Sequence, residues 1–267
     1  MQEHYRKKFF DIIRSIVPES ALALKLRELK WWFDERRNSR YYEIKNDVAT
    51  LNLGGEIGQK IVFPQYNKVK PLYSHIDLPS YFQVPLIKEG STVVDAGASP
   101  GDFTVVASKM VGPKGRIYAF EPDPDGRRYL GEMIKANDIS NVTIIPLALD
   151  ISSRKNTFFR HKMGLYDKRF NIRRYGQSIF RAEATSLDDF FKDVKVDVIK
   201  MDIEGAEINV INGAKRIIQE MNPAFIIASY HNVDGNPTSI KLEQILKSNY
   251  KNVKTLYKNH QTTYAYD

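Results

Sequence analysis

A glycine-bearing turn is the first part of the chain whose residue types and spacing could do chemistry. It reads Val94-Asp95-Ala96-Gly97-Ala98-Ser99-Pro100-Gly101, with an apolar run before it and a helical pattern after it. Glycines in such a turn let the backbone approach a ligand closely, and the start of the next helix directs free amide groups toward that ligand. We therefore expect a nucleotide-type ligand in contact with Gly97, Ala98, Ser99 and Gly101.

The spacing of the glycines and the carboxylate before them indicates which ligand this is. Gly97 and Gly101 are separated by three residues, which differs from the dinucleotide fingerprint G-x-G-x-x-G. Asp95 at the end of the apolar run would repel a pyrophosphate, whereas its field would attract ammonium and sulfonium groups. S-adenosylmethionine carries both of these cationic groups, so Asp95 favours this methyl donor.

A second carboxylate follows the next apolar run, in Phe120-Glu121-Pro122-Asp123. The carboxyl ends of neighbouring parallel strands share one edge of a sheet, where the two oxygens of Glu121 could accept both ribose hydroxyls. We include Pro122 and Asp123 in the same cofactor site. The alternatives are helix capping or turn formation by Asp95 and a solvated strand-end carboxylate at Glu121.

The third predicted strand ends in Leu147-Ala148-Leu149-Asp150. We expect Ala148 and Leu149 to pack against the adenine ring, with Asp150 as a weaker candidate to accept a hydrogen bond from the exocyclic amine. Simple packing in the core is an equal alternative for the apolar residues.

Residues for the reaction itself are expected at the fourth and fifth strand ends. The fourth reads Lys200-Met201-Asp202-Ile203-Glu204-Gly205-Ala206-Glu207, and ligands bind in open α/β sheets at such junctions. His231 follows the fifth strand, and imidazole is the side chain whose ordinary pKa lies nearest neutrality. We expect His231 to be the general base. Asp202 could orient the acceptor or serve as the base instead, and Lys200 could lower the pKa of the acceptor hydroxyl.

Other interpretations of these two junctions stay open. Glu204 and Glu207 could stabilise the start of a helix with Lys200 as their neutralising charge, and a strand-end histidine is often a polar cap. Because hard cations take oxygen ligands, a divalent ion on Asp202, Glu204 or Asp234 is the alternative to the metal-free site that we expect.

The elements that must position these residues alternate between apolar runs and helical patterns after Gly90. Expected strands are 92–96, 116–120, 142–149, 196–201 and 224–230, and expected helices are 102–110, 125–136 and 207–220. Their continuous hydrophobicity suits strands buried on both faces of a parallel sheet. Two β-rich runs around a polar turn, 252–257 and 262–266, predict a terminal hairpin that adds an antiparallel strand. The predicted fold class is α/β, a mostly parallel Rossmann-like sheet with a C-terminal antiparallel hairpin.

A helical element is expected before this sheet. Apolar residues at helical spacing predict amphipathic helices over 3–17 and 22–33, the second with basic residues on its other faces. Four prolines make residues 48–86 an irregular connector with short strands. We expect residues 1–85 to form this element and connector, and residues 86–267 to form the cofactor-binding domain. The helices are expected to pack on that domain, with peripheral contact to a membrane as an alternative.

Composition narrows the classes of function. With 42% hydrophobic and 27% charged residues the chain is globular rather than disordered, and the lack of cysteine excludes disulfides and thiolate chemistry. Because the chain has no apolar run of the roughly 20 residues that span a bilayer, and no secretory signal, we expect a cytoplasmic protein. The net charge of +8 suits anionic partners, or equally a well-solvated basic surface.

A segment between the third and fourth strands, residues 150–185, interleaves basic and aromatic residues. Such a mixture suits contact with phosphate, carboxylate or a sugar ring. It is the candidate acceptor platform, and a basic surface hairpin packed by its own aromatic residues is the alternative.

Taken together, these pieces resemble the FkbM-type methyltransferase family. The matching segments, in order, are 94–102, 119–124, 185–190, 200–207 and 212–214. The resemblance covers roughly residues 91–231. It implies a class I methyltransferase fold and methyl transfer from S-adenosylmethionine, commonly to hydroxyls of sugars, glycolipids or polyketide-type natural products.

We therefore expect an S-adenosylmethionine-dependent O-methyltransferase whose acceptor is a glycan or a related small molecule. One alternative is an RNA methyltransferase, which the basic charge and the aromatic residues would suit, although the chain has no recognisable RNA-binding module. Another is a non-catalytic binding protein that kept the fold. A dehydrogenase is disfavoured by the glycine spacing.

Overall fold

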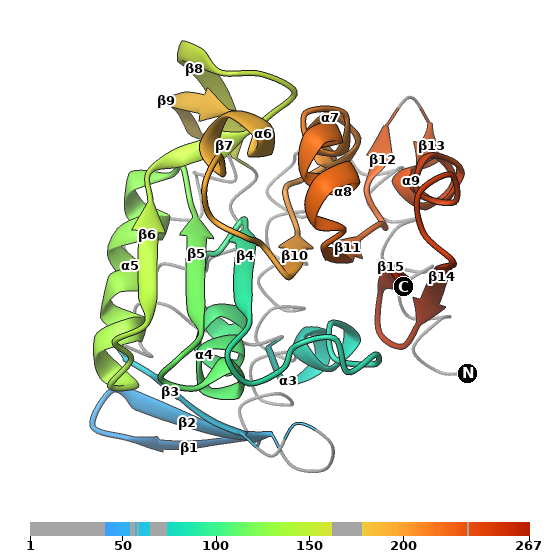
Figure 1. The fold of residues 1–267 in the computed structure, drawn as a ribbon. Coiled ribbons are helices and arrows are strands. Elements are labelled where there is room, and N and C mark those ends of the chain that lie inside the picture. Colours follow the sequence, from blue (N-terminus) through green and yellow to red (C-terminus); the bar gives the residue numbers. More distant parts are fainter. Residues whose placement is uncertain (1–40, 54–56, 58, 65–73, 162–177, 234) are drawn as a thin grey trace, which may run out of the picture.

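A seven-stranded sheet is the centre of the computed structural model (Figure 1). The structure describes residues 41–53, 57, 59–64, 74–161, 178–233 and 235–267. The strands of the sheet are β4 (Thr92–Ala96), β5 (Arg116–Phe120), β6 (Val142–Ile145), β10 (Val198–Met201), β11 (Ala224–Ala228), β14 (Asn252–Tyr257) and β15 (Gln261–Tyr266). Their order across the sheet is β14-β15-β11-β10-β4-β5-β6.

The direction of the strands confirms the predicted sheet. β4 pairs in parallel with β5 and β10, and the pairs β5–β6 and β10–β11 are also parallel. β15 runs antiparallel to both of its neighbours, β11 and β14. The sheet is therefore mostly parallel, and a C-terminal hairpin inserts its one antiparallel strand.

Helices cover both faces of this sheet, because side chains alternate along each strand and give each face its own core. Val93 packs into one hydrophobic cluster and Val94 into the other. The first face carries α4 (Asp102–Val111) and α5 (Pro124–Ala136), and the second carries α6 (Leu187–Phe190), α7 (Glu207–Asn212), α8 (Lys215–Met221) and α9 (Thr238–Leu246). In the described ranges, no helix is both long enough and apolar enough to cross a membrane.

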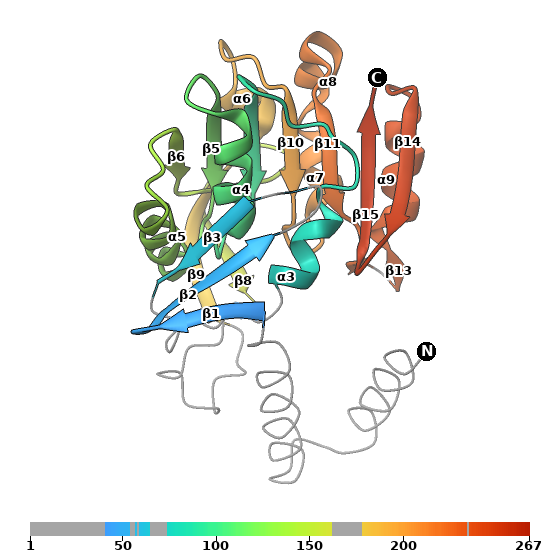
Figure 2. The same cartoon turned by 90° about the horizontal axis from the view of Figure 1, so that it is seen from below.

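The predicted irregular connector is more regular than expected. It forms an antiparallel sheet of β1 (Tyr42–Lys45), β2 (Val48–Leu53) and β3 (Gln59–Phe63), followed by α3 (Ser74–Asp77) and the 3-10 helix η2 (Leu78–Ser80). Figure 2 shows this small sheet and α3 on the same side of the main sheet as α4.

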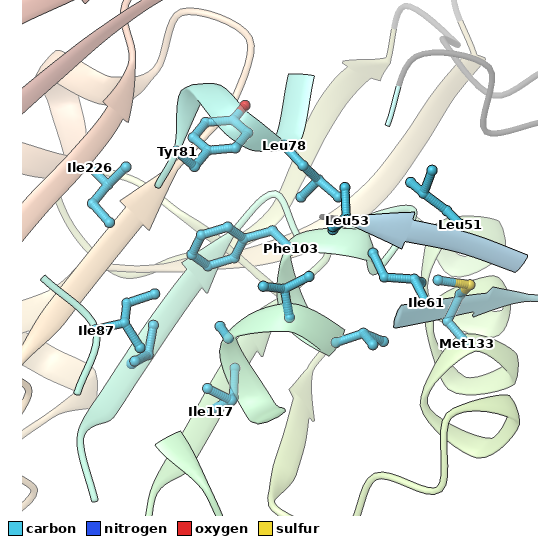
Figure 3. Close-up of a cluster of buried hydrophobic side chains, with 14 of the residues drawn as sticks. Leu51, Leu53, Ile61, Leu78, Tyr81, Ile87, Phe103, Ile117, Met133 and Ile226 are labelled. Carbon is cyan, nitrogen blue, oxygen red and sulfur yellow. The ribbon is translucent and has the colours of Figure 1, made fainter. Parts of the chain in front are cut away.

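Apolar side chains join this connector to the main domain. Leu51 and Ile61 lie near Met133 of α5 in the close-up of the first cluster (Figure 3). Asn137, which ends α5, pairs with the backbone of Val62, accepting from its N–H at 2.8 Å and donating to its carbonyl oxygen at 2.7 Å. The connector and the main sheet therefore share one core.

Two predicted elements are divided in the structure. The strand expected over 142–149 splits at Pro146, which has no N–H for the ladder. The second half leaves the main sheet as β7 (Leu147–Leu149) and joins β8 (Arg154–His161) and β9 (Ser178–Thr185) in the order β7-β9-β8. The helix expected over 207–220 breaks at Gly213 into α7 and α8.

Some predictions fall on residues outside the described ranges. These are the helices expected over 3–17 and 22–33, Asp234, and residues 162–177 of the proposed acceptor platform. The ends of that segment form the β8–β9 hairpin. A further short pair, β12 (Asn232–Val233) with β13 (Asn236–Pro237), follows β11.

Gly213 is expected to be irreplaceable at the break between α7 and α8. A Cβ at this position would lie 2.7 Å from the carbonyl oxygens of both Asp150 and Ile151. Gly213→Ala should lower the free energy of unfolding in a urea titration by about 1–3 kcal/mol, since backbone atoms cannot move aside cheaply. Gly131→Ala in α5 is the control, because its Cβ would lie 3.9 Å from Ile144. It should be neutral or stabilising by about 0.5–1 kcal/mol. Equal effects of the two changes would contradict this account.

Candidate functional site

The candidate site lies where the order of the strands reverses, at the carboxyl ends of β4, β5 and β10. From β4 the chain continues outward through β5 and β6, and it then crosses to β10 and β11 on the other side of β4. A crevice at such a switch point is where open α/β sheets bind ligands. The residues expected at the strand ends are thereby brought to one edge of the sheet.

The turn after β4 packs directly against the end of β10. Gly97 has a φ of +73°, and a Cβ there would lie 2.0 Å from the carbonyl oxygen of Asp202. The N–H groups of Gly97 and Ala98 both donate to the carbonyl oxygen of Phe120, at 3.0 and 3.1 Å. These two amides are therefore engaged inside the fold, and the contact of Gly97 and Ala98 with a ligand stays a prediction.

Glu121 is buried and fixed beside the turn. Its Oε2 accepts from the N–H of Ser99 at 3.0 Å, and its Oε1 accepts from the N–H of Asp123 at 2.9 Å. A Cβ on Gly126 would lie 3.0 Å from the carboxyl carbon of Glu121, so α5 approaches this carboxylate closely.

The other residues predicted around the cofactor have structural partners. Asp123 caps α5 by accepting from the N–H of Asp125 at 3.1 Å, and Pro122 precedes it. Ala148 and Leu149 are buried in β7. Asp150, the weaker candidate, lies 3.5 Å from the guanidinium of Arg154.

Asp95 and Lys200 form a buried ion pair beneath the turn. Asp95 is 0% exposed, and its Oδ1 lies 2.9 Å from Nζ of Lys200 while its Oδ2 accepts from Oγ1 of Thr104 at 2.5 Å. Nζ of Lys200 also donates to the carbonyl oxygen of Gly97 at 3.1 Å. Burial alone would lower the pKa of Lys200, but neighbouring aspartates, Asp95 first among them, outweigh burial and raise it.

This pair changes what was expected of both residues. The carboxylate of Asp95 is neutralised by an ammonium group, so it does not present an uncompensated charge to a methyl donor. Lys200 is committed to Asp95 and the turn, so its charge is not directed at an acceptor hydroxyl. Both residues instead fix the turn that the cofactor is expected to contact.

Asp202, at the end of β10, is surrounded by tyrosine and histidine side chains. Its side chain is 25% exposed, and its Oδ2 accepts from the hydroxyl of Tyr81 at 2.7 Å. The hydroxyl of Tyr230 lies 3.4 Å from Oδ1, and Nε2 of His231 lies 3.5 Å from the same oxygen. The structure therefore brings together Asp202 and His231, two of the three residues expected to act on the acceptor.

Aromatic rings form walls beside Asp202. The ring of His260, from the turn between β14 and β15, lies 5.0 Å from that of Tyr81 and 5.1 Å from that of Tyr230, measured between centroids. The Tyr81 hydroxyl points away from the apolar side chains of the first cluster (Figure 3). Burial lowers the pKa of His260, so this ring is neutral near pH 7.

Sequence reasoning missed Tyr81 and His260. Tyr81 lies in the proline-rich connector and His260 in a hairpin turn, and neither carries a local motif. They approach Asp202 through the tertiary fold alone. Tyr230 stands next to His231, and this adjacency was the one available signal for it.

His231 lies between two carboxylates. Its Nδ1 is 3.0 Å from Oε1 of Glu207, an ionic contact rather than a well-aligned hydrogen bond. Burial alone would lower the pKa of His231, but Glu207, Asp202 and Glu204 together raise it above its ordinary value. The sequence placed Glu207 in the charged cluster after the fourth strand, with stabilisation of a helix start as the alternative, and gave no sign of its contact with His231.

A further carboxyl group makes the acceptor side acidic. Burial first, then the charges of Asp102 and Asp202, raise the pKa of Asp77 to about 7. Within the described ranges, no group of three or more histidine and acidic side chains is arranged to hold a metal ion. An open hollow of about 720 Å³, lined among others by Ser91, Asp197 and Ala224, lies at the amino ends of β4, β10 and β11, away from these residues.

The mixed sheet with one inserted antiparallel strand is the architecture of class I methyltransferases. The chain belongs to the methyltransferase FkbM domain family, whose sequence model matches residues 95–252. The crystal structure of a methyltransferase FkbM from Methylobacillus flagellatus shares this fold, with a TM-score of 0.50 at 21% identity. The similarity covers 73% of this chain and 52% of that one.

Two curated proteins show the range of relatives. A provisionally named ribosomal RNA methyltransferase of Schizosaccharomyces pombe is 30% identical over 160 residues, which are 60% of this chain and 48% of that protein. The hexuronic acid methyltransferase AglP of Haloferax volcanii is 25% identical over 146 residues, 54% of this chain and 57% of that protein. The chain thus spans about half the length of these relatives.

The buried ion pair should be essential for stability. Lys200→Met would leave the Asp95 carboxylate buried without its cation, so we expect a loss of about 3–5 kcal/mol in the free energy of unfolding, measured by urea titration. Lys195→Met removes the exposed ion pair with Asp197 and should cost less than about 1 kcal/mol. The double change Asp95→Asn with Lys200→Met should recover part of the loss. A Lys200→Met effect no larger than that of Lys195→Met would refute this role.

Proposed function

We propose that this chain transfers a methyl group from S-adenosylmethionine to a hydroxyl group of a saccharide, glycolipid or related natural product. The observation that carries the proposal is the position of Glu121, fixed beside the glycine turn at the switch point, with Asp202 and His231 on the adjoining strand ends. Membership of a methyltransferase family supports it. In this proposal residues 86–267 form the catalytic domain.

The residues beside the turn fit an adenosyl ligand. Glu121 would accept the ribose hydroxyls, while the backbone of Gly97, Ser99 and Gly101 would line the ligand. Oγ of Ser99 is buried and has no hydrogen-bond partner among the described residues. An unsatisfied hydroxyl beside a fixed carboxylate suits a polar ligand, because buried polar groups are normally hydrogen-bonded. When bound, the donor supplies an electrophilic methyl group on a sulfonium.

The residues of the acceptor side have separate tasks in this proposal. His231 accepts the proton of the acceptor hydroxyl, since the neighbouring carboxylates raise its pKa above the ordinary value and make it a stronger base. Asp202 orients the hydroxyl, as it already accepts from the hydroxyl of Tyr81. The exposed ring of Tyr230 gives a sugar ring an aromatic surface on which to pack.

RNA is the second candidate acceptor. The name of the Schizosaccharomyces pombe relative and the net charge of +8 favour it. The carboxyl groups of Asp202, Glu204 and Glu207 beside the proposed base disfavour a polyanion at that point. A hydroxyl on a neutral part of a small acceptor is therefore preferred.

Cofactor choice can be tested by calorimetric titration. We expect S-adenosylmethionine and S-adenosylhomocysteine to bind and NAD not to bind. Glu121→Gln should weaken the binding of S-adenosylmethionine by about 10–100-fold, because hydrogen bonds to a charged group contribute about 1.5–3 kcal/mol. Asp125→Asn, an exposed acidic position on the adjoining helix, is the control and should bind normally. Binding of NAD without either sulfur compound would overturn the proposal.

Turnover tests the proposed base. His231→Ala should bind the cofactor as the unchanged chain does. Its rate of methyl transfer should fall by about 100-fold or more, which is the usual contribution of a general base. Transfer would be followed by mass spectrometry with a methyl-labelled donor, using glycan and RNA fractions of a cell extract as acceptors. Undiminished turnover would eliminate His231 as the base. If the label appeared only in the RNA fraction, the acceptor would be RNA and not a saccharide.

A further inference from the structure

We infer that Glu207 is a positioning residue, which holds Nδ1 of His231 so that Nε2 is the ring atom presented to the acceptor. The inference about the ring's orientation stands on the geometry of the two side chains. Its catalytic consequence rests on the proposed function.

Glu207 is held rigidly by the loop that precedes it. The residue is 0% exposed, and its Oε1 accepts from the N–H of Ile203 at 3.1 Å and from the N–H of Gly205 at 3.3 Å. The same oxygen lies 3.0 Å from Nδ1 of His231. Two backbone donors thus fix the carboxylate, and the carboxylate in turn fixes one edge of the imidazole.

A buried carboxylate needs such a partner. Taking a charge out of water costs several kcal/mol unless opposite charge and hydrogen bonds compensate it. Oε2 of Glu207 has no hydrogen-bond partner among the described residues, so the two amides satisfy only one of its oxygens. Among the described residues, the group in ion-pair contact with Glu207 is His231, which can supply a compensating positive charge when it is protonated.

The contact also selects the tautomer of neutral His231. An ionised carboxylate only accepts hydrogen bonds, and each ring nitrogen faces one: Oε1 of Glu207 lies 3.0 Å from Nδ1, and Oδ1 of Asp202 lies 3.5 Å from Nε2. The shorter contact favours a ring hydrogen on Nδ1 when His231 loses its other proton, which leaves the lone pair on the buried Nε2 beside Asp202. A base must present its lone pair to the proton that it removes, so in this inference the acceptor hydroxyl reaches Nε2 from the side of Asp202.

The charges around His231 determine its behaviour with pH. The titratable groups that face it are Glu207, on α7, then Asp202 and Glu204 in the loop before α7, and the adjacent ring of Tyr230, 4.3 Å away between centroids. The three carboxylates outweigh burial and raise the pKa of His231. The fraction of His231 in the base form should therefore increase with pH, and it should do so at higher pH than for an ordinary imidazole.

A purely structural role for Glu207 makes a different prediction. If Glu207 served only to tie down the loop over 203–205, a glutamine of the same shape could still accept from both amides. His231 would then titrate as before. Glu207→Gln separates the two roles, because it removes the charge and keeps the acceptor oxygen.

The first experiment needs no substrate and leaves Glu207 unchanged. Nitrogen chemical shifts of the ¹⁵N-labelled histidines, recorded across pH and assigned to His231 by comparison with His231→Ala, report both its pKa and its tautomer. We expect a pKa above the ordinary value, with the ring hydrogen on Nδ1 at high pH. A hydrogen on Nε2 would overturn the inference, whether or not the protein transfers methyl groups.

The second experiment applies the same titration to Glu207→Gln. The pKa of His231 should fall, and it should fall less in Glu204→Gln, which removes an exposed charge from the same loop. An unchanged pKa in Glu207→Gln would also overturn the inference. Circular dichroism melting shows whether this variant is folded. If it is not, the tautomer of His231 measured in the unsubstituted chain decides the inference.

Kinetics then connect the contact to the reaction. In Glu207→Gln the acidic limb of the kcat profile should move to lower pH, and the plateau of kcat should fall about 10–100-fold, as for other groups that orient a functional imidazole. The dissociation constant of S-adenosylmethionine should not change. An unchanged plateau of kcat in Glu207→Gln would show that the contact does not contribute to the reaction. Absence of methyl transfer in the unsubstituted chain would refute the proposed function and leave the orientation of His231 in place.

Discussion

The ion pair between Asp95 and Lys200 is the contact on which both sides of the site depend. The register of the sheet places these residues directly opposite each other on β4 and β10, and Lys200 also reaches the carbonyl oxygen of Gly97. A buried pair of this kind is stable only while each charge keeps its partner. It therefore anchors the glycine turn and the end of β10 together. Glu121 is hydrogen-bonded to that turn, and Asp202 follows Lys200 by two positions.

The two sides differ in how they handle charge. On the cofactor side, carboxylates are satisfied by groups of the fold itself: Asp95 by a lysine, and Glu121 by backbone amides. On the proposed acceptor side, Asp202 accepts from the hydroxyl of Tyr81, and Glu207 contacts His231, whose ring can take up or release a proton. The first arrangement is rigid, and the second contains the titratable group that the proposed reaction needs.

The difference between local and tertiary information explains what could be predicted from sequence. The parallel strands, the inserted hairpin and the strand-end positions of Glu121, Asp202 and His231 follow from patterns of a few residues each. The partners do not: the charges of Asp95 and Lys200 are visible in the sequence, but their pairing depends on the sheet register. Tyr81 and His260 carry no motif because tertiary contacts alone bring them to Asp202. The breaks at Pro146 and Gly213 arise from a missing N–H and from a close backbone approach.

The inserted strand β15 has a consequence for the order in which the molecule is assembled. Tyr264 in this strand donates to the carbonyl oxygen of Ser80, a residue 184 positions earlier, and His260 stands just before the strand. Contacts between such distant positions form late, because closing a long loop must precede them. The glycine turn reaches Glu121 across 22 positions and Lys200 across 103, both fewer than the 184 between Ser80 and Tyr264. The contacts that fix the turn can thus form before the aromatic rings around Asp202 are complete, because His260 reaches its place only when the β14–β15 hairpin has docked on β11.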